Sequence, residues 1–156
     1  MKFEIPKPLQ AEHEELHATL VKATKAPGTV GEAAREVARL LHPHFVREEE
    51  FALPPLALLS ELALGRLTPA MAEVLPMTRR LKAELPAMLA EHKQIVGALD
   101  GLRAAAAAAN LPEYERFAEA LTLHAQTEEE VLYPAAILIG EHVALILETR
   151  ARAPGR

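Results

Sequence analysis

The feature that most constrains this chain is a pattern of His, Glu and Pro that occurs once in each half. The pattern is a histidine, three glutamates that begin four residues later, and a proline four residues after the last glutamate: His44, Glu48–Glu50, Pro54 and His124, Glu128–Glu130, Pro134. An Ala-Glu-His triplet precedes each copy, and its histidine lies 31 residues before the pattern in the first half (His13) and 32 residues before it in the second (His92). This duplication predicts one set of metal ligands made of four histidines and two glutamates.

The composition predicts an all-α protein. Half of the residues are hydrophobic, yet only 4% are aromatic, and Ala and Leu dominate, which favours helices over strands. A length of 156 residues is typical of one domain with a core of ordinary size. We therefore expect a single domain, 1–156, with its core at 9–138.

Charge and cysteine content exclude several classes of partner and site. A net charge of -5 and a pI near 5.8 argue against nucleic acid, which needs clustered Lys and Arg. The chain has no cysteine, so it offers no disulfide and no thiolate metal ligand. No run approaches 18 consecutive apolar residues, and the start of the chain, 1–9, is unlike a signal peptide. We expect a cytoplasmic protein with no membrane partner. The sequence does not indicate its oligomeric state.

Proline and glycine divide the chain into helical hairpins. The expected helices are 9–25, one from about 30 that carries His44 and Glu48, 77–108 with a kink near Pro86, and one from about 112 that carries His124 and Glu128. Thr29 and Glu32 have the spacing of a capping box, which predicts the second helix start. Between the second and third helices we expect an extra helical segment, in which a helix begins at Thr68-Pro69. A short helical tail is expected at 141–150.

Helix geometry tests whether the repeated residues can meet. Residues four apart lie about 40° apart on one helix face, so each His/Glu pair can hold one site. His13 and His44 each lie about 15 residues, or about 22 Å of helix, from the turn between them. The same arithmetic places His92 level with His124. Two hairpins packed as a bundle would therefore bring all four histidines into one layer.

Only one glutamate of each run shares the face of its histidine. Glu49 and Glu129 are turned by about 100° from Glu48 and Glu128, so they are expected to face solvent or to support the ligands. Taken singly, a helical histidine is usually packing and a glutamate run is usually a solvated face. The recurrence of the whole set at fixed spacing favours a metal site with six ligands: His13, His44, Glu48, His92, His124 and Glu128.

These residues resemble the hemerythrin-like proteins, also called the HHE cation-binding domain. The resemblance covers residues 9–138 and consists of a lone histidine, a His-x-x-x-Glu pair, and the same set again. It implies a hemerythrin-like up-and-down four-helix bundle around two non-heme iron ions. The two glutamates would bridge the irons, together with an oxo or hydroxo group. An open coordination position would take O₂, NO or a related small ligand.

The chain departs from the oxygen-carrying members in two ways. Those members have a second histidine one turn after the first on the third helix, where this chain has Val96, and an aspartate where it has Glu128. The ligand set instead resembles a broader bacterial group associated with O₂ or NO sensing, iron handling and repair of iron–sulfur centres. The repair proteins usually carry an N-terminal segment with a cysteine. This chain lacks such a segment, which argues against a role in iron–sulfur repair.

Three functions are compatible with this ligand set. The first is a non-enzymatic di-iron protein that binds O₂ or NO, or senses or stores iron. The second is a di-iron enzyme or iron donor acting on ferrous iron, peroxide or NO. The third is a structural bundle that holds zinc or no metal. Imidazole and carboxylate ligands without thiolate suit iron, with zinc or manganese as substitutes.

Histidines and aromatic residues outside the repeat need separate interpretations. His17 lies one turn after His13 and is a candidate additional ligand. In that case one ion would have His13, His17 and His44 and the other His92 and His124. Otherwise His17 would line the pocket or bind a carboxylate. Outside the site we expect His42 and His142, whereas two aromatic residues, Phe45 and Tyr133, are expected to pack in the core or line the pocket.

Overall fold

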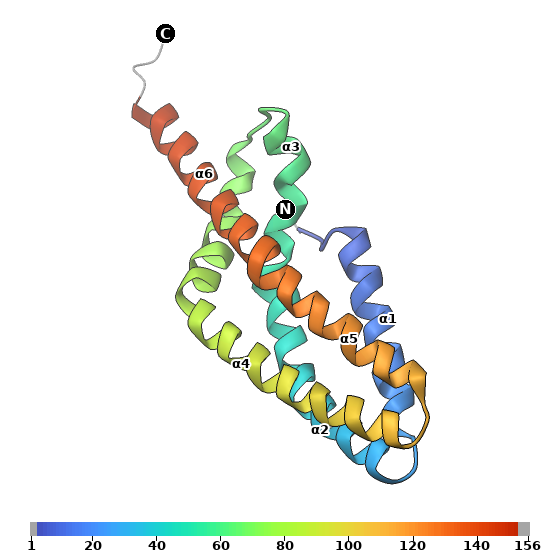
Figure 1. Cartoon of the computed structure of the whole chain (residues 1–156). Helices are drawn as coiled ribbons and strands as arrows, with labels where there is room; N and C mark the ends of the chain where they lie inside the picture. The colour runs from blue at the N-terminus through green and yellow to red at the C-terminus, as the bar shows by residue number, and fades with distance from the viewer. Residues whose placement is uncertain (1–2, 153–156) are drawn as a thin grey trace.

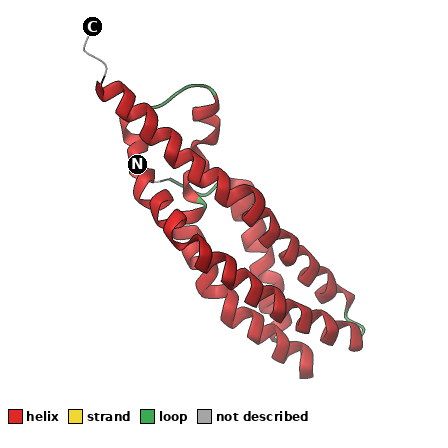
Figure 2. Cartoon of the chain, turned by 60° about the vertical axis from the view of Figure 1, so that its left-hand side comes forward, coloured by secondary structure: helices red, strands yellow, loops and turns green. Residues whose placement is uncertain are grey.

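The computed structural model describes residues 3–152, and within this range the chain is an all-helical bundle (Figure 2). Its four long helices are α1 (Lys7–Thr24), α2 (Gly28–Arg47), α4 (Leu75–Ala108) and α5 (Pro112–Thr127). α1 packs on α2, α2 on α4, α4 on α5, and α5 on α1. The α1–α2 and α4–α5 turns lie at the same end of the bundle (Figure 1). The predicted all-α, up-and-down four-helix bundle is confirmed.

The predicted extra segment between the second and third helices is present. It consists of four short elements: the π-helix η1 (Glu48–Ala52), the 3-10 helix η2 (Pro54–Leu58), the α-helix α3 (Leu59–Ala63) and the 3-10 helix η3 (Pro69–Val74). Pro69 begins η3 as expected, but no Thr68 side-chain bond caps it. Two prolines in succession, Pro54-Pro55, remove backbone donors and interrupt the α-helical ladder here.

The predicted short tail is wrong, because the last helix is much longer. α6 (Tyr133–Arg152) follows α5 through a π-helix, η4 (Glu128–Leu132), and the three form one helix of 41 residues. Its most apolar 18-residue window has a mean hydropathy of 1.6 and is 28% buried. Length and composition alone would allow this helix to cross a membrane, but core helices meet the same criteria. Here the helix also carries buried His124 and Glu128.

The helix ends near the turns show how local sequence sets the hairpins. The predicted capping box is wrong: α2 already begins at Gly28, which has a positive φ of 66°, and no side chain caps it. α4 ends at Ala108, and Asn110, two residues beyond it, adopts a left-handed φ of 55°. The amide of Leu111 then bonds to the carbonyl of Ala106, and that of Asn110 bonds to Ala107. This pair of bonds is a Schellman motif, in which Asn replaces the usual Gly.

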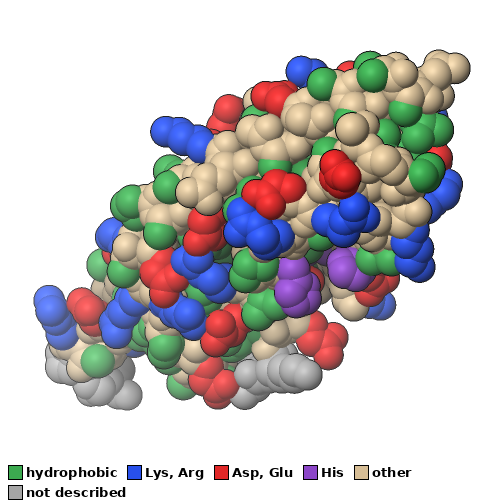
Figure 3. All heavy atoms as spheres, turned by 90° about the horizontal axis from the view of Figure 1, so that it is seen from below, with side chains coloured by type: hydrophobic (Ala, Val, Ile, Leu, Met, Phe, Trp, Pro, Cys, Tyr) green, Lys and Arg blue, Asp and Glu red, His purple; other side chains and the backbone are tan. Residues whose placement is uncertain are grey.

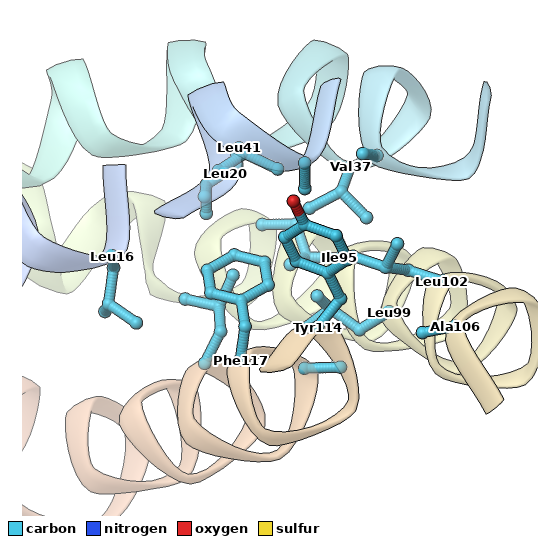
Figure 4. Close-up of a cluster of buried hydrophobic side chains, with 14 of the residues drawn as sticks. Leu16, Leu20, Val37, Leu41, Ile95, Leu99, Leu102, Ala106, Tyr114 and Phe117 are labelled. Atoms are coloured by element: carbon cyan, nitrogen blue, oxygen red, sulfur yellow. The ribbon is translucent and has the colours of Figure 1, made fainter. Parts of the chain in front are cut away.

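Two apolar clusters lie on either side of the histidine layer. One fills the bundle toward the hairpin turns, and Figure 4 shows its side chains from all four helices pointing toward one another. Its labelled members are Leu16, Leu20, Val37, Leu41, Ile95, Leu99, Leu102, Ala106, Tyr114 and Phe117. The other cluster lies around η1, η2, η3, α6 and the first part of α4. The two clusters fix the helices above and below the polar layer.

Gly140 is needed where α6 approaches α4. A Cβ added at Gly140 would lie 2.1 Å from Oγ1 and 2.6 Å from Cβ of Thr78. We therefore expect Gly140→Ala to lower the free energy of unfolding by about 1–3 kcal/mol through overpacking. Gly101→Ala is the control, because nothing lies within 4 Å of that position, and it should stabilise α4 by about 0.5–1 kcal/mol. Urea unfolding measures both, and a Gly140→Ala variant as stable as the wild type would contradict the packing.

Candidate metal centre

All six residues of the duplicated pattern meet in one buried layer of the bundle. α1 supplies His13, α2 His44, α4 His92 and α5 His124, while Glu48 and Glu128 begin the two π-helices. Each of the six side chains is at most 3% exposed. Charged groups are rarely buried this deeply unless they are paired or bind metal.

The six residues divide into two donor groups. His44, His92, Glu48 and Glu128 form one group, and His13, His124 and Glu128 form the other. The ring pairs follow the same division, because His44 packs edge-on against His92 at 4.6 Å and His13 against His124 at 5.0 Å. The pairing of His13 with His44, which ligation by His17 would have implied, does not match these groups. The histidine pairs join helices of different hairpins.

Each glutamate spans both groups through its two oxygens. Glu128 places Oε1 3.0 Å from Nε2 of His124 and Oε2 3.3 Å from Nε2 of His92. Glu48 places Oε1 3.0 Å from Nε2 of His44 and Oε2 3.9 Å from Nε2 of His13. One oxygen of each carboxylate thus faces each group. This is the arrangement that bridging carboxylates require.

Two of these oxygens have no hydrogen-bond partner. Oε2 of Glu48 and Oε1 of Glu128 are buried without one. Oε1 of Glu128 lies 3.0 Å from Nε2 of His124 without forming a hydrogen bond, and a buried charged acceptor without one is costly. Unused lone pairs at the centre of converging imidazoles are what metal ligands need, so the residues fit a metal ion.

Outer glutamates orient every histidine of the layer. Nδ1 faces a glutamate oxygen in all four: His13 and Glu49 at 3.3 Å, His44 and Glu91 at 2.6 Å, His92 and Glu129 at 3.0 Å, His124 and Glu12 at 3.1 Å. Because a carboxylate only accepts, Nδ1 carries the hydrogen and Nε2 keeps its lone pair toward the centre. Such partners fix the tautomer and orientation of metal-binding histidines.

These outer contacts refine the sequence analysis. Glu49 and Glu129 support the ligands, which is one of the two roles expected for them. Glu12 and Glu91 were missed, although both belong to the duplicated Ala-Glu-His triplet and were therefore visible as a repeat. Each of the two triplet glutamates contacts a histidine of the other half. The triplets thus tie the hairpins together across the layer.

Tyr133 is a further component of the layer that sequence reasoning left as packing or pocket lining. Its side chain is fully buried, its ring stacks on His92, and its hydroxyl donates to Oε1 of Glu48. The hydroxyl oxygen also lies 3.4 Å from Nε2 of His44 and 3.3 Å from Nε2 of His92. Burial first, and then the charges of Glu48 and Glu128, raise the pKa of the phenol. The hydroxyl therefore keeps its proton.

The π-helix η4 explains why Tyr133 reaches the site. In an α-helix, a residue five positions after Glu128 would lie about 140° around the axis. The amide of Tyr133 bonds to the carbonyl of Glu128 across one wider π-turn, and this turn returns Tyr133 toward the face of Glu128. η1 repeats the bond from Leu53 to Glu48 at 2.9 Å, but Leu53 has no polar atom to present.

A cavity of about 680 Å³ connects the layer with the surface. Its walls come from residues 3–5, α1, α2 and the start of η1, and they include His13, His17, His42, Phe45 and Glu49. Phe45 is buried and stacks on His13 with ring centres 4.2 Å apart. The predicted pocket-lining role of Phe45 is therefore confirmed, together with its core contacts.

The other three histidines are exposed. They are His17, His42 and His142, and histidine side chains are visible at the surface in Figure 3. His17 lies outside both donor groups of the described residues and in the cavity wall. The grouping of His17 with His13 and His44 on one ion is therefore wrong, because α1 turns His17 outward.

The carboxylates control the pKa values in the layer. Burial alone would lower the pKa of His92, but contacts with Glu128 and Glu48 raise it to about 10. Burial likewise opposes the rise of the His124 pKa to about 9, which contact with Glu128 causes. Burial would raise the pKa of Glu128, but the histidines hold it well below the usual range. Without metal, the charge of Glu128 is thus compensated by imidazolium.

A comparison of the sequence with models of known protein families identifies the family of this chain. Residues 4–136 match the hemerythrin HHE cation binding domain. The chain belongs to this family. No curated protein and no solved structure matched the chain. For this hemerythrin domain, the buried His/Glu cluster therefore fits a metal site on both family and geometric grounds.

The metal-free hemerythrin domain should lose stability in alkaline solution. A raised histidine pKa contributes stability that is complete below the unfolded value of 6.5 and is lost as pH rises through about 9 to 10. At about 1.4 kcal/mol per unit of pKa shift, we expect chelator-treated protein to lose on the order of several kcal/mol of unfolding free energy between pH 6.5 and 9.5. Urea unfolding at both pH values measures the loss, with zinc-loaded protein as the control that should not show it. Equal stability at both pH values would disprove the coupling.

Proposed function

We propose that this chain is a non-heme di-iron protein that binds O₂, NO or a related small ligand, or senses or stores iron. One observation carries the proposal: four Nε2 atoms and two carboxylates converge, and two buried carboxylate oxygens lack hydrogen-bond partners. His13, His44, His92 and His124 would each supply one nitrogen. Glu48 and Glu128 would bridge the ions.

The donor set supports iron. Imidazole and carboxylate ligands suit iron, manganese and zinc, whereas copper(I) prefers the soft thiolates that this chain lacks. Two bridging carboxylates offset part of the charge of two divalent ions in a buried layer. Bound iron would supply open coordination positions and redox chemistry, which the side chains cannot provide.

The cavity favours a ligand-binding site over a closed structural one. Structural zinc sites are four-coordinate and closed, whereas reactive sites keep a position open. His13, which belongs to the second group, lines the cavity, so a position open to a ligand could be reached from the surface. The same cavity exceeds what a diatomic molecule needs, and this supports a second candidate, an enzyme or iron donor acting on ferrous iron, peroxide or NO.

Loss of a ligand should lower metal content. We expect His44→Ala and Glu128→Ala to retain one iron or none per chain and to melt at lower temperature, because bound metal adds to stability by mass action. Elemental analysis measures the iron. Two variants serve as controls and should retain wild-type iron: Glu49→Gln, whose amide oxygen can still accept from His13, and Glu50→Gln, whose carboxylate faces Arg80 at 3.1 Å. Two irons in His44→Ala and Glu128→Ala would refute the ligand assignment.

Absorption spectroscopy separates the candidate functions. Protein expressed with iron should be coloured in the diferric state, and its spectrum should change on titration with NO or O₂. His17→Ala should leave the diferric spectrum unchanged, since His17 is exposed. Steady turnover of peroxide, ferrous iron or NO would identify the enzyme instead. Colourless protein containing only zinc would overturn the iron proposal.

A further inference from the structure

The two donor groups are unequal although duplicated segments supply them. Glu48 lies closer to the first group than to the second, because its Oε1 is 3.0 Å from Nε2 of His44 whereas its Oε2 is 3.9 Å from Nε2 of His13. Two further features follow the same division: a tyrosine hydroxyl beside the first group and a cavity beside the second. Each bears on where an added ligand can bind.

Tyr133 fills the remaining space beside the first group. Ligand atoms bound to one ion at about 2.0–2.2 Å lie roughly 3.0–3.5 Å apart. The Tyr133 oxygen lies 3.3 Å from Nε2 of His92 and 3.4 Å from Nε2 of His44. It therefore stands where a further ligand of that ion would stand. The ring is 0% exposed and stacks on His92 at 5.7 Å, so the oxygen is held in place.

The cavity reaches only the second group. Of its lining residues, His13 belongs to the second group, and none belongs to the first. Val46, which is 52% exposed, and His17 form part of the wall nearer the surface. The residue at the repeat position of Tyr133 is Leu53, which is buried in the apolar cluster. No hydroxyl from that position competes for the second group.

We propose that Tyr133 is a specificity-determining residue that closes the ion position of His44 and His92. A diatomic ligand then binds only the ion of His13 and His124, which it reaches through the cavity. This inference rests on the proposed di-iron function. It gives the two ions different access: the ion of His13 and His124 receives the ligand, and the ion of His44 and His92 does not.

The stoichiometry of nitric oxide tests the role of Tyr133. Iron-loaded, reduced protein is titrated with NO without oxygen, after its iron content has been measured. Wild-type protein should bind one NO per two irons. Tyr133→Leu, which copies the residue of the other repeat, should bind two. Two NO in the wild type, or one NO in a Tyr133→Leu variant that retains both irons, would overturn the proposal.

The rate of NO binding tests the route and does not depend on Tyr133→Leu folding. Val46→Trp should obstruct the cavity and lower the association rate at least tenfold, with one NO still bound per two irons. Leu145→Trp is the control, because Leu145 is 61% exposed on α6, outside the cavity wall, and its rate should match the wild type. An unchanged rate in Val46→Trp would overturn the route.

The iron measurement separates this inference from the proposed function. Fewer than two irons per wild-type chain would refute the di-iron function and the inference with it. Two irons with no bound NO would refute only the inference, since the second ion would then have no reachable position. Two irons, one NO and a slow Val46→Trp variant would support both.

Discussion

Two carboxylates buried at the centre of the bundle are the constraint on which the rest of the structure depends. Glu48 and Glu128 are at most 1% exposed, and an uncompensated buried charge is strongly destabilising. Nearby cations must therefore offset them. The histidines can do so as imidazolium or as ligands of metal ions, but not in both forms at once. The outer glutamates hold each Nδ1–H, so only Nε2 changes partner when metal replaces a proton.

Duplication builds the layer, and small departures from duplication make its two sides different. Both halves place a carboxylate at the start of a π-helix and a histidine against an outer glutamate. The halves diverge after these shared parts. Pro54-Pro55 breaks the first half into short elements, whereas Pro134 alone lets α6 continue. Tyr133 replaces Leu53 at the same repeat position, and the hydroxyl it adds points into the layer.

The sequence predicted those parts of the site that depend on α-helical periodicity. The i, i+4 spacing and the distances from the turns located the four histidines and two glutamates in one layer. The same α-helical geometry could not predict Tyr133, because its position depends on one π-turn. Nor could it predict which histidines lie in the same donor group, because that depends on how the two hairpins pack against each other in the bundle.

The placement of the apolar clusters determines how metal and folding are coupled. Small zinc domains have little core and unfold without metal. Here one cluster packs the bundle toward the turns and another packs it beyond the layer, and neither needs the ligands. The helices are therefore held in register before any ion binds. A metal ion would then meet oriented nitrogens and carboxylate oxygens that lack hydrogen bonds, so little of its binding free energy would be used to order the chain.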